Sequence, residues 1–308
     1  MRIGLWIPAV EKKPLEETLE RYAQAERDGF ATAWTPQMFG PDALTMLALG
    51  GKITSRIELG TSVVPTFPRH PVALAQQALT VQAATGGRLA LGLGLSHQVV
   101  IEGMLGLSYK KPARHMREYL TILRDLRDTG KASFEGETYR VGATARVAAE
   151  TPFPIIVAAL GPRMLAIAGE LGDGTITWMV GPETLASHIV PGITKSAAQA
   201  GHPAPRVVAA LPVCVTDDAP LARKTAAEIF AMYGGLPSYR AMLDREGAGG
   251  PEDVSIVGSE KEVRDALKRM ADAGATDFGA AIFPAGPDAE ASQARTYAFL
   301  ASLGGKLG

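Results

Sequence analysis

The chain has 308 residues, of which 46% are hydrophobic and 20% charged, a balance typical of folded globular proteins rather than disordered ones. The formal net charge of −1 gives no reason to expect nucleic acid or an anionic membrane as a partner. A single cysteine, Cys214, excludes an internal disulfide framework and any multi-cysteine metal site. No targeting segment and no run of about 20 apolar residues occurs, so we expect a cytoplasmic protein.

Eight short apolar runs, most of them rich in β-branched residues, predict β-strands. They cover residues 2–8, 31–35, 57–64, 88–94, 154–159, 175–178, 206–215 and 277–283. Two prolines bear on these strands, because proline has no N–H to donate to a sheet ladder. Pro65 is expected to end the third strand, and Pro212 is expected at an edge, a bulge or a strand end.

Helices are predicted after the strands, where apolar residues recur at intervals of three and four. Asp42 is expected to cap the second helix, and the pair Asp217–Asp218 a later one. Ser259 and Glu262 have the spacing of a capping box at the start of another helix.

Two segments are expected to lie outside this repeat of strand and helix. Residues 132–141 predict a small β-hairpin. The glycine- and proline-rich region 234–257 is expected to be irregular, and a lid is one interpretation of it. We therefore predict one domain, 1–308, with insertions near 131–151 and 234–257. Eight strand–helix units favour an α/β protein closed into a (β/α)8 TIM barrel, and an open doubly wound sheet is the alternative.

The fourth predicted strand runs into a glycine-containing stretch, residues 92–97 (GLGLSH). A dinucleotide-binding fingerprint would need a third glycine where His97 stands, so that interpretation fails. Ser96 and His97 do not form a catalytic dyad, because neighbouring residues of an extended chain point to opposite faces. The histidines also lack H-x-x-x-H spacing, and we expect no metal site.

Polar or aromatic residues that follow barrel strands are candidates for a site at the carboxyl ends of those strands. His97 follows the fourth strand, and Gln37 follows the second. Trp6 and Trp178 lie near the ends of two further strands. Each of these residues also has an ordinary interpretation as packing or surface, and the sequence leaves both open.

Small residues at 158–162 end the fifth strand and open a helix. Such a turn lets backbone N–H groups approach an anion at the positive end of the helix. Arg163 could add a charge-assisted contact. A phosphate site and an ordinary strand–helix turn both remain open at this point.

An ordered set of short motifs over most of residues 1–180 resembles the luciferase-like monooxygenase superfamily, in its coenzyme F420-dependent oxidoreductase branch. The motifs are 59–64 (LGTSVV), 69–71 (RHP), 74–77 (LAQQ), 86–89 (GGRL), 91–94 (LGLG), 154–159 (PIIVAA) and 172–174 (GDG).

The resemblance implies a TIM barrel with insertions that binds coenzyme F420 at the strand ends, as a homodimer. It implies an oxidoreductase that transfers a hydride between F420 and a small organic substrate. It also implies a non-proline cis peptide at Ser62–Val63. His97 is the expected proton-handling residue, and Gln37 the expected polar orienter. The residues expected to bind the cofactor are Pro36, Thr61, Ser62, Val63, Val64, Leu95, Ser96, Ala158, Ala159, Leu160, Gly161, Pro162, Arg163, Thr177 and Trp178.

The chain departs from the family where several members carry a histidine after the second strand. Gln37 stands there and cannot act as an acid or a base near neutral pH, so the sugar-phosphate oxidation of one branch is not carried over. An FMN-dependent monooxygenase using O₂ and a partner reductase is an alternative, as is a flavin- or deazaflavin-binding protein without turnover. Arg69, Arg114 and Arg163 are candidates for a basic groove, which would favour F420 because FMN lacks a polyglutamate tail.

Overall fold

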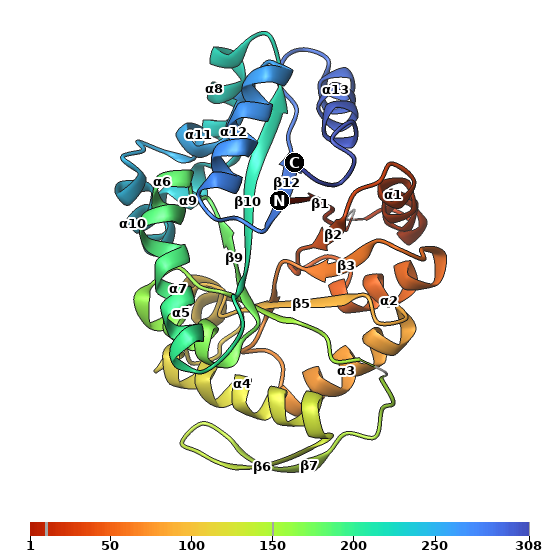
Figure 1. Ribbon diagram of the computed structural model, residues 1–308, viewed down its shortest axis with the longest axis vertical. Coiled ribbons are helices and arrows are strands. Elements are labelled where there is room, and N and C mark those ends of the chain that lie inside the picture. The colour runs from red at the N-terminus through yellow and green to blue at the C-terminus, as the bar shows by residue number, and fades with distance from the viewer. Residues whose placement is uncertain (10–11, 150, 308) are drawn as a thin grey trace.

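A closed barrel of eight parallel strands forms the centre of the molecule, with helices packed around it (Figure 1). The computed structural model describes residues 1–9, 12–149 and 151–307. Around the ring, the strands are β1 (Arg2–Trp6), β2 (Thr32–Thr35), β3 (Glu58–Thr61), β5 (Leu89–Gly94), β8 (Ile155–Ala158), β9 (Gly174–Trp178), β10 (Arg206–Val215) and β12 (Asp277–Ile282). Because β12 pairs with β1 as well as β10, the ring closes. The predicted TIM barrel is confirmed, and the open sheet is excluded.

The outer layer consists of helices that follow the strands. They are α1 (Leu15–Arg27), α2 (Ala43–Ile53), α3 (Pro71–Ala84), α4 (Pro112–Thr129), α5 (Pro162–Leu171), α7 (Val190–Gln199), α8 (Ala219–Ile229), α12 (Glu260–Asp272) and α13 (Ala289–Ala301). Short π-helices η1 (Val99–Met104) and η2 (Leu185–Ile189) and the short helix α6 (Pro182–Thr184) interrupt the connections. None of the helices in the described part of the chain is long and apolar enough to cross a membrane.

The expected helix caps are present. Asp42 accepts a hydrogen bond from the backbone N–H of Thr45 at the start of α2, and Asp218 caps α8. At α12, Ser259 and Glu262 make both bonds of the capping box. Local sequence therefore fixes where these helices begin.

The barrel interior is separated from the larger core beneath the helices by the alternation of side chains along each strand. Along β1, Ile3 and Leu5 pack outward under the helices, and Trp6 packs inward. The interior cluster consists of Trp34, Ala90, Ile156, Ile176 and Val208. Gly60 must lack a side chain here, because a Cβ would lie 2.3 Å from the Trp34 ring.

The third predicted strand is divided in two. β3 ends at Thr61, and β4 (Val64–Pro65) then pairs with β5. Between them, the Ser62–Val63 peptide bond is cis, as predicted. The strand does end at Pro65, as its missing N–H suggested.

Region 234–257 was expected to be irregular, and that prediction is wrong. The segment contains the end of α9 (Ala231–Gly235), then α10 (Pro237–Glu246), α11 (Pro251–Val254) and the start of β11 (Ile256–Gly258), which pairs with β10. Its prolines stand at the first position of α10 and α11, where proline costs no hydrogen bond. Gly247 ends α10 in the left-handed conformation. The glycines and prolines therefore mark helix ends rather than coil.

Pro212 lies inside β10, not at a strand end or sheet edge. It is paired with Ala281 of β12. On the other side of β10, the ladder with β9 stops at Ala210 and the ladder with β11 starts at Val213. Pro212, which has no N–H, therefore lies where the partner of β10 changes from β9 to β11. This position explains why a proline is tolerated in a central strand.

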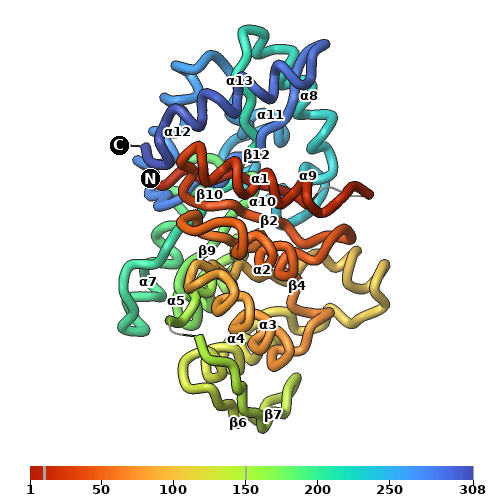
Figure 2. Tube along the Cα trace, turned by 90° about the vertical axis from the view of Figure 1, so that its right-hand side faces the viewer, coloured from red at the N-terminus to blue at the C-terminus, as the bar shows by residue number. Residues whose placement is uncertain are grey.

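The predicted hairpin forms as β6 (Lys131–Glu135) and β7 (Arg140–Thr144), at the end of the molecule away from α8 and α13 (Figures 1 and 2). Glu118 of α4 fixes its turn by accepting hydrogen bonds of 2.8–3.1 Å from three consecutive backbone N–H groups, residues 137–139. The first and last described residues of the chain lie close together, with the Met1 ammonium 3.0 Å from the Leu307 carbonyl oxygen (Figure 1).

Candidate active site

The carboxyl ends of all eight barrel strands open on the same side, here called the mouth, because all the strands are parallel. Four side chains close the barrel just below it: Trp6, Val63, Ala158 and Trp178. The two tryptophan rings meet edge to face, with centroids 4.2 Å apart, and Val63 and Ala158 pack on the interior cluster. We call these four residues the apolar platform.

Two glycines of β5 allow the chain around Ser62–Val63 to approach. A Cβ on Gly92 would lie 1.9 Å from the Thr61 carbonyl oxygen, and one on Gly94 would lie 2.9 Å from a Val63 methyl and 3.1 Å from Ala158. Thr61 reinforces the contact by donating its hydroxyl to the Gly92 carbonyl at 2.6 Å. The apparent glycine motif is thus explained by strand packing beside the mouth.

The buried polar atoms near the platform that have no hydrogen-bond partner among the described residues include the Ser62 hydroxyl and the Trp6 indole nitrogen. An unsatisfied buried polar group costs about 1–3 kcal/mol, so such groups are uncommon in folded proteins. Unpaired polar atoms beside an apolar surface suit a planar, partly polar ring system. The residues present therefore fit a flavin-like cofactor.

His97 follows β5 directly and is half-buried at the mouth. Neither ring nitrogen bonds to another residue that the structure describes, so both are available to a ligand. Burial lowers the pKa of His97, which favours the neutral imidazole. A neutral imidazole can accept or donate a proton at a substrate atom.

The chain is strained where it leaves two of the strands at the mouth. Ser96 (φ 59°) and Met179 (φ 56°) both adopt the left-handed conformation, which costs non-glycine residues energy. The Tyr109 hydroxyl donates to the Ser96 carbonyl at 3.2 Å and holds the turn that presents His97. Strain of this kind concentrates at functional sites.

Two tyrosines that sequence reasoning missed reach the same region from α9 and α10. The Tyr239 ring lies 5.5 Å from His97 and 5.3 Å from Tyr233, between ring centroids. Tyr233 in turn lies 5.7 Å from Trp178 of the platform. A continuous row of rings therefore runs from His97 to the platform. The available signal was limited to Tyr239, an aromatic residue in the segment 234–257 that was expected to be irregular.

Gln37 is occupied by the backbone around the start of α2. Its carbonyl oxygen accepts the Ala43 N–H at 2.7 Å, and its amide donates to the Met38 carbonyl at 3.2 Å. Pro36 precedes it directly after β2. In this arrangement Gln37 shapes the loop after β2, and its role as an orienter of substrate stays a prediction.

The β8–α5 turn carries the predicted residues from Ala158 to Arg163. Ala159 is buried under the helices, and Leu160 accepts a hydrogen bond from the His188 ring at 2.8 Å. Gly161 precedes α5 without a side-chain cap, so no side chain satisfies the N–H groups of the first turn. The main chain of this turn can therefore bind an anion.

The predicted cofactor residues are not all brought to the mouth. Thr177 lies on the opposite face of β9 from Ile176 and Trp178, so its side chain points away from the platform. Val64 is also fully buried in the outer core. By contrast, Leu95, Ser96 and His97 leave β5 together at the mouth.

Two of the three arginines proposed for a basic groove lie together, and the third does not. Arg69 forms an ion pair with Asp42 at the start of α2. Arg114 and Arg163, however, line one groove together with Arg117, which the sequence had not singled out.

Comparison with known proteins agrees with this geometry. A family model for the luciferase-like monooxygenases matches residues 1–295. A Mycobacterium tuberculosis protein named as a coenzyme F420-dependent oxidoreductase is 33% identical over 253 residues, 76% of this chain and 73% of that protein. An F420-dependent glucose-6-phosphate dehydrogenase of Intrasporangium calvum is 32% identical over 210 residues, 63% of each chain.

Among solved structures, the coenzyme F420-dependent tetrahydromethanopterin reductase of Methanopyrus kandleri superposes with a TM-score of 0.78 at 23% identity. The match covers 98% of this chain and 97% of the reductase. At this identity, the likeness establishes the shared fold.

Proposed function

The chain belongs to the luciferase-like monooxygenase family, and we propose that it transfers a hydride between coenzyme F420 and a small organic substrate. The observation that carries the proposal is the mouth itself, where the apolar platform lies beside the unpaired Ser62 hydroxyl and the free imidazole of His97. The relative from Mycobacterium tuberculosis, named as F420-dependent, supports the choice of cofactor.

In this proposal, Val63 and Ala158 form the surface behind the deazaflavin ring, and the main chain of the β8–α5 turn binds the phosphate. When bound, F420 supplies the hydride chemistry. The row of rings from Tyr239 to Trp178 borders the substrate and limits the access of water.

His97 handles the proton that accompanies the hydride. Its lowered pKa keeps the imidazole neutral near pH 7, so it accepts the proton of a substrate hydroxyl during oxidation and returns it during reduction. Burial also raises the pKa of Tyr239, which keeps that phenol protonated as a hydrogen-bond donor.

The test is a titration of the purified protein with F420 and, separately, FMN, followed by fluorescence. We expect micromolar binding of F420 and weaker binding of FMN. Binding of neither would contradict the proposal, and a preference for FMN would favour the monooxygenase alternative.

His97→Asn separates binding from chemistry. We expect its F420 affinity to stay within about threefold of the wild type, while turnover falls roughly 10²- to 10⁴-fold, because a positioned proton-transfer group is lost. Turnover is followed by F420 absorbance over a panel of alcohols and carbonyl compounds. His202→Asn is the matched control, since His202 lies beyond α7 and bonds to the Glu170 carbonyl. Unchanged turnover in His97→Asn would remove His97 from the mechanism.

A further inference from the structure

A groove of about 320 Å³ runs between the amino-terminal parts of α4 and α5, which lie side by side (Figures 1 and 2). We call it the arginine groove. Its lining residues are Ala113, Arg114, Arg117, Arg163, Ala166 and Ile167. Both helices begin at this end, directly after the loops that leave β5 and β8. The groove therefore lies on the mouth side of the barrel.

The groove has a surplus of positive charge. Arg114 and Lys111 share one carboxylate, Glu137, and Arg117 makes a bidentate pair of 2.6 and 2.7 Å with Glu170. Arg163 is exposed and makes no ion pair or hydrogen bond with any other described residue. Four cationic groups thus face two carboxylates, and one guanidinium is entirely free to bind an anion.

The helix ends increase this positive potential. α4 and α5 have no acidic residue in their first turns, and neither helix has a side-chain cap. A cation in the first turn lies at the positive end of the helix dipole, which is unfavourable without a compensating anion. Arg114 and Arg163 both occupy first turns, so the local structure is arranged for a negatively charged ligand.

The groove is continuous in sequence with the candidate active site. Ala158 belongs to the apolar platform, and the turn after it leads directly to Pro162 and Arg163 at the start of α5. A ligand with its ring on the platform and its phosphate at this turn would extend its remaining chain toward the groove. FMN ends at its phosphate, whereas F420 continues into a chain of glutamates.

We propose that the arginine groove binds the glutamate tail of F420. This inference rests on the proposed function and extends that function by assigning a separate subsite to the tail of the cofactor. Arg163 is the principal anchor because its guanidinium has no competing partner. Arg117 and Arg114 contribute long-range attraction while they remain paired with Glu170 and Glu137.

The experiment compares the binding of F420 with one glutamate, F420 with five or more glutamates, and the deazaflavin core that lacks phosphate and tail. Each is titrated into the full-length protein by fluorescence. We expect affinity to rise with tail length at low salt. The gain should shrink as NaCl is raised from 50 to 500 mM, because contacts between exposed charges are screened.

Arg163→Glu should weaken the binding of long-tailed F420 about tenfold and leave the tail-less core unaffected. Arg163→Lys keeps the charge and should retain most of the gain. Since Arg163 has no partner in the protein, both variants should keep the wild-type Tm. Lys268→Glu, an exposed charge reversal on α12, is the matched control and should change none of these affinities.

The outcomes separate the two proposals. If no deazaflavin binds, the proposed function fails and this inference fails with it. If all three ligands bind equally well to the wild type, or if Arg163→Glu keeps the full gain from the tail, the function stands and the tail subsite is wrong. Competition by inorganic phosphate equal to that by free oligo-γ-glutamate would show a general anion site and would also overturn the assignment to the tail.

Discussion

His115 is a buried residue that makes the free energy of unfolding depend on pH. Its Nε2 atom lies 2.9 Å from the Thr66 hydroxyl, and the Phe67 ring stacks on the imidazole with centroids 3.9 Å apart. Burial lowers the pKa of His115 to about 4, although the nearby Glu118 carboxylate acts in the opposite direction. The folded protein therefore excludes the charged form that the unfolded chain adopts readily.

We expect the free energy of unfolding to fall by about 2 kcal/mol between pH 7 and pH 5 because of this residue. The folded pKa is depressed, so in this range the unfolded chain binds a proton that the folded protein does not. Acidification consequently favours unfolding. In His115→Gln, whose amide can still bond to Thr66, the loss should be about 2 kcal/mol smaller, as measured by urea unfolding at both pH values. Equal losses in the two proteins would contradict the assignment.

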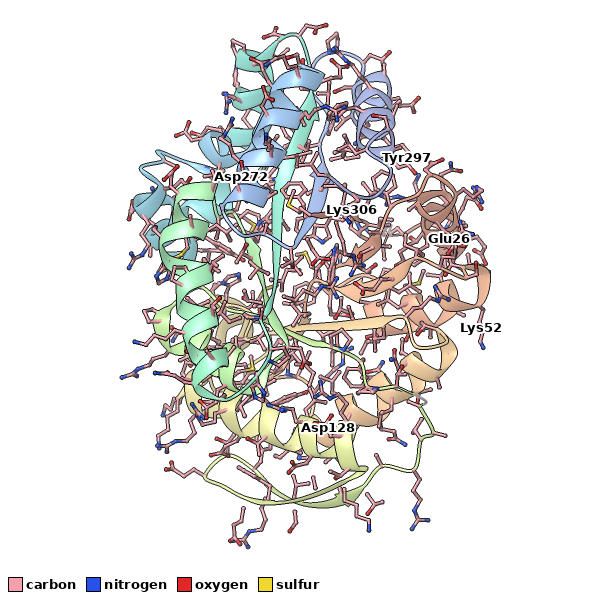
Figure 3. All side chains as sticks on the ribbon, viewed as in Figure 1. Glu26, Lys52, Asp128, Asp272, Tyr297 and Lys306 are labelled. Atoms are coloured by element: carbon pink, nitrogen blue, oxygen red, sulfur yellow. The ribbon has the colours of Figure 1, made fainter. Side chains whose placement is uncertain are left out.

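At the scale of elements, single side chains fix how a helix and a strand meet. Glu26 near the end of α1 (labelled in Figure 3) accepts hydrogen bonds from the backbone N–H groups of Ser55, Arg56 and Ile57, just before β3. Partial burial acts to raise the pKa of Glu26, but the three backbone donors outweigh it and lower the pKa to about 2. The carboxylate thus ties α1 to the chain entering β3.

Glu26→Gln should destabilise the protein by about 1–2 kcal/mol at pH 7, because an amide oxygen is a weaker acceptor for three N–H groups. Because the pKa of Glu26 is depressed in the folded protein, the stabilisation given by its carboxylate is complete above pH 4.5. This stabilisation is lost as the pH falls toward 2. Glu20→Gln is the control on the same helix, since Glu20 forms an exposed ion pair with Arg27, and it should cost under about 0.5 kcal/mol. Denaturant unfolding of the three proteins at pH 7 and pH 4 checks both expectations.

At the scale of the whole molecule, a charged network closes the barrel at the end opposite the mouth. Arg206 of β10 binds Asp277 of β12 at 2.7 Å and Glu58 of β3 at 2.5 Å, and Arg2 of β1 pairs with both carboxylates. Burial opposes the charge on Arg206, but hydrogen bonds to the two carboxylates hold its pKa above the ordinary value. The network joins strands that are far apart in the sequence.

Arg206→Leu should destabilise the protein by roughly 3–5 kcal/mol, because the nearly buried Asp277 loses its main partner. Arg295→Leu removes an arginine that also binds two carboxylates, Asp217 and Glu260, at the surface, and it should cost at most about 1 kcal/mol. Equilibrium unfolding at pH 7 measures both. A loss in Arg206→Leu no larger than in Arg295→Leu would show that the barrel does not depend on this network.

The sequence by itself determined the parts of the protein that depend on local pattern. Apolar runs predicted the eight barrel strands. Asp42, Asp218 and Ser259 predicted the caps of α2, α8 and α12. Each of these features depends on residues only a few positions apart. The resemblance to a family added the cis peptide at Ser62–Val63. His97 was found as a candidate because its place after a strand is readable in sequence.

Only the tertiary structure decided which side chains meet. Tyr239 reaches His97 across more than 140 residues, and Arg117 joins Arg163 because α4 packs against α5. The same holds for Arg69, which pairs with Asp42 and so lies away from the groove. Thr177 is different, because the alternation of side chains along β9 alone turns it away from Trp178. Local periodicity specifies elements, whereas the site and the groove arise from ring closure and helix packing, which bring distant residues together.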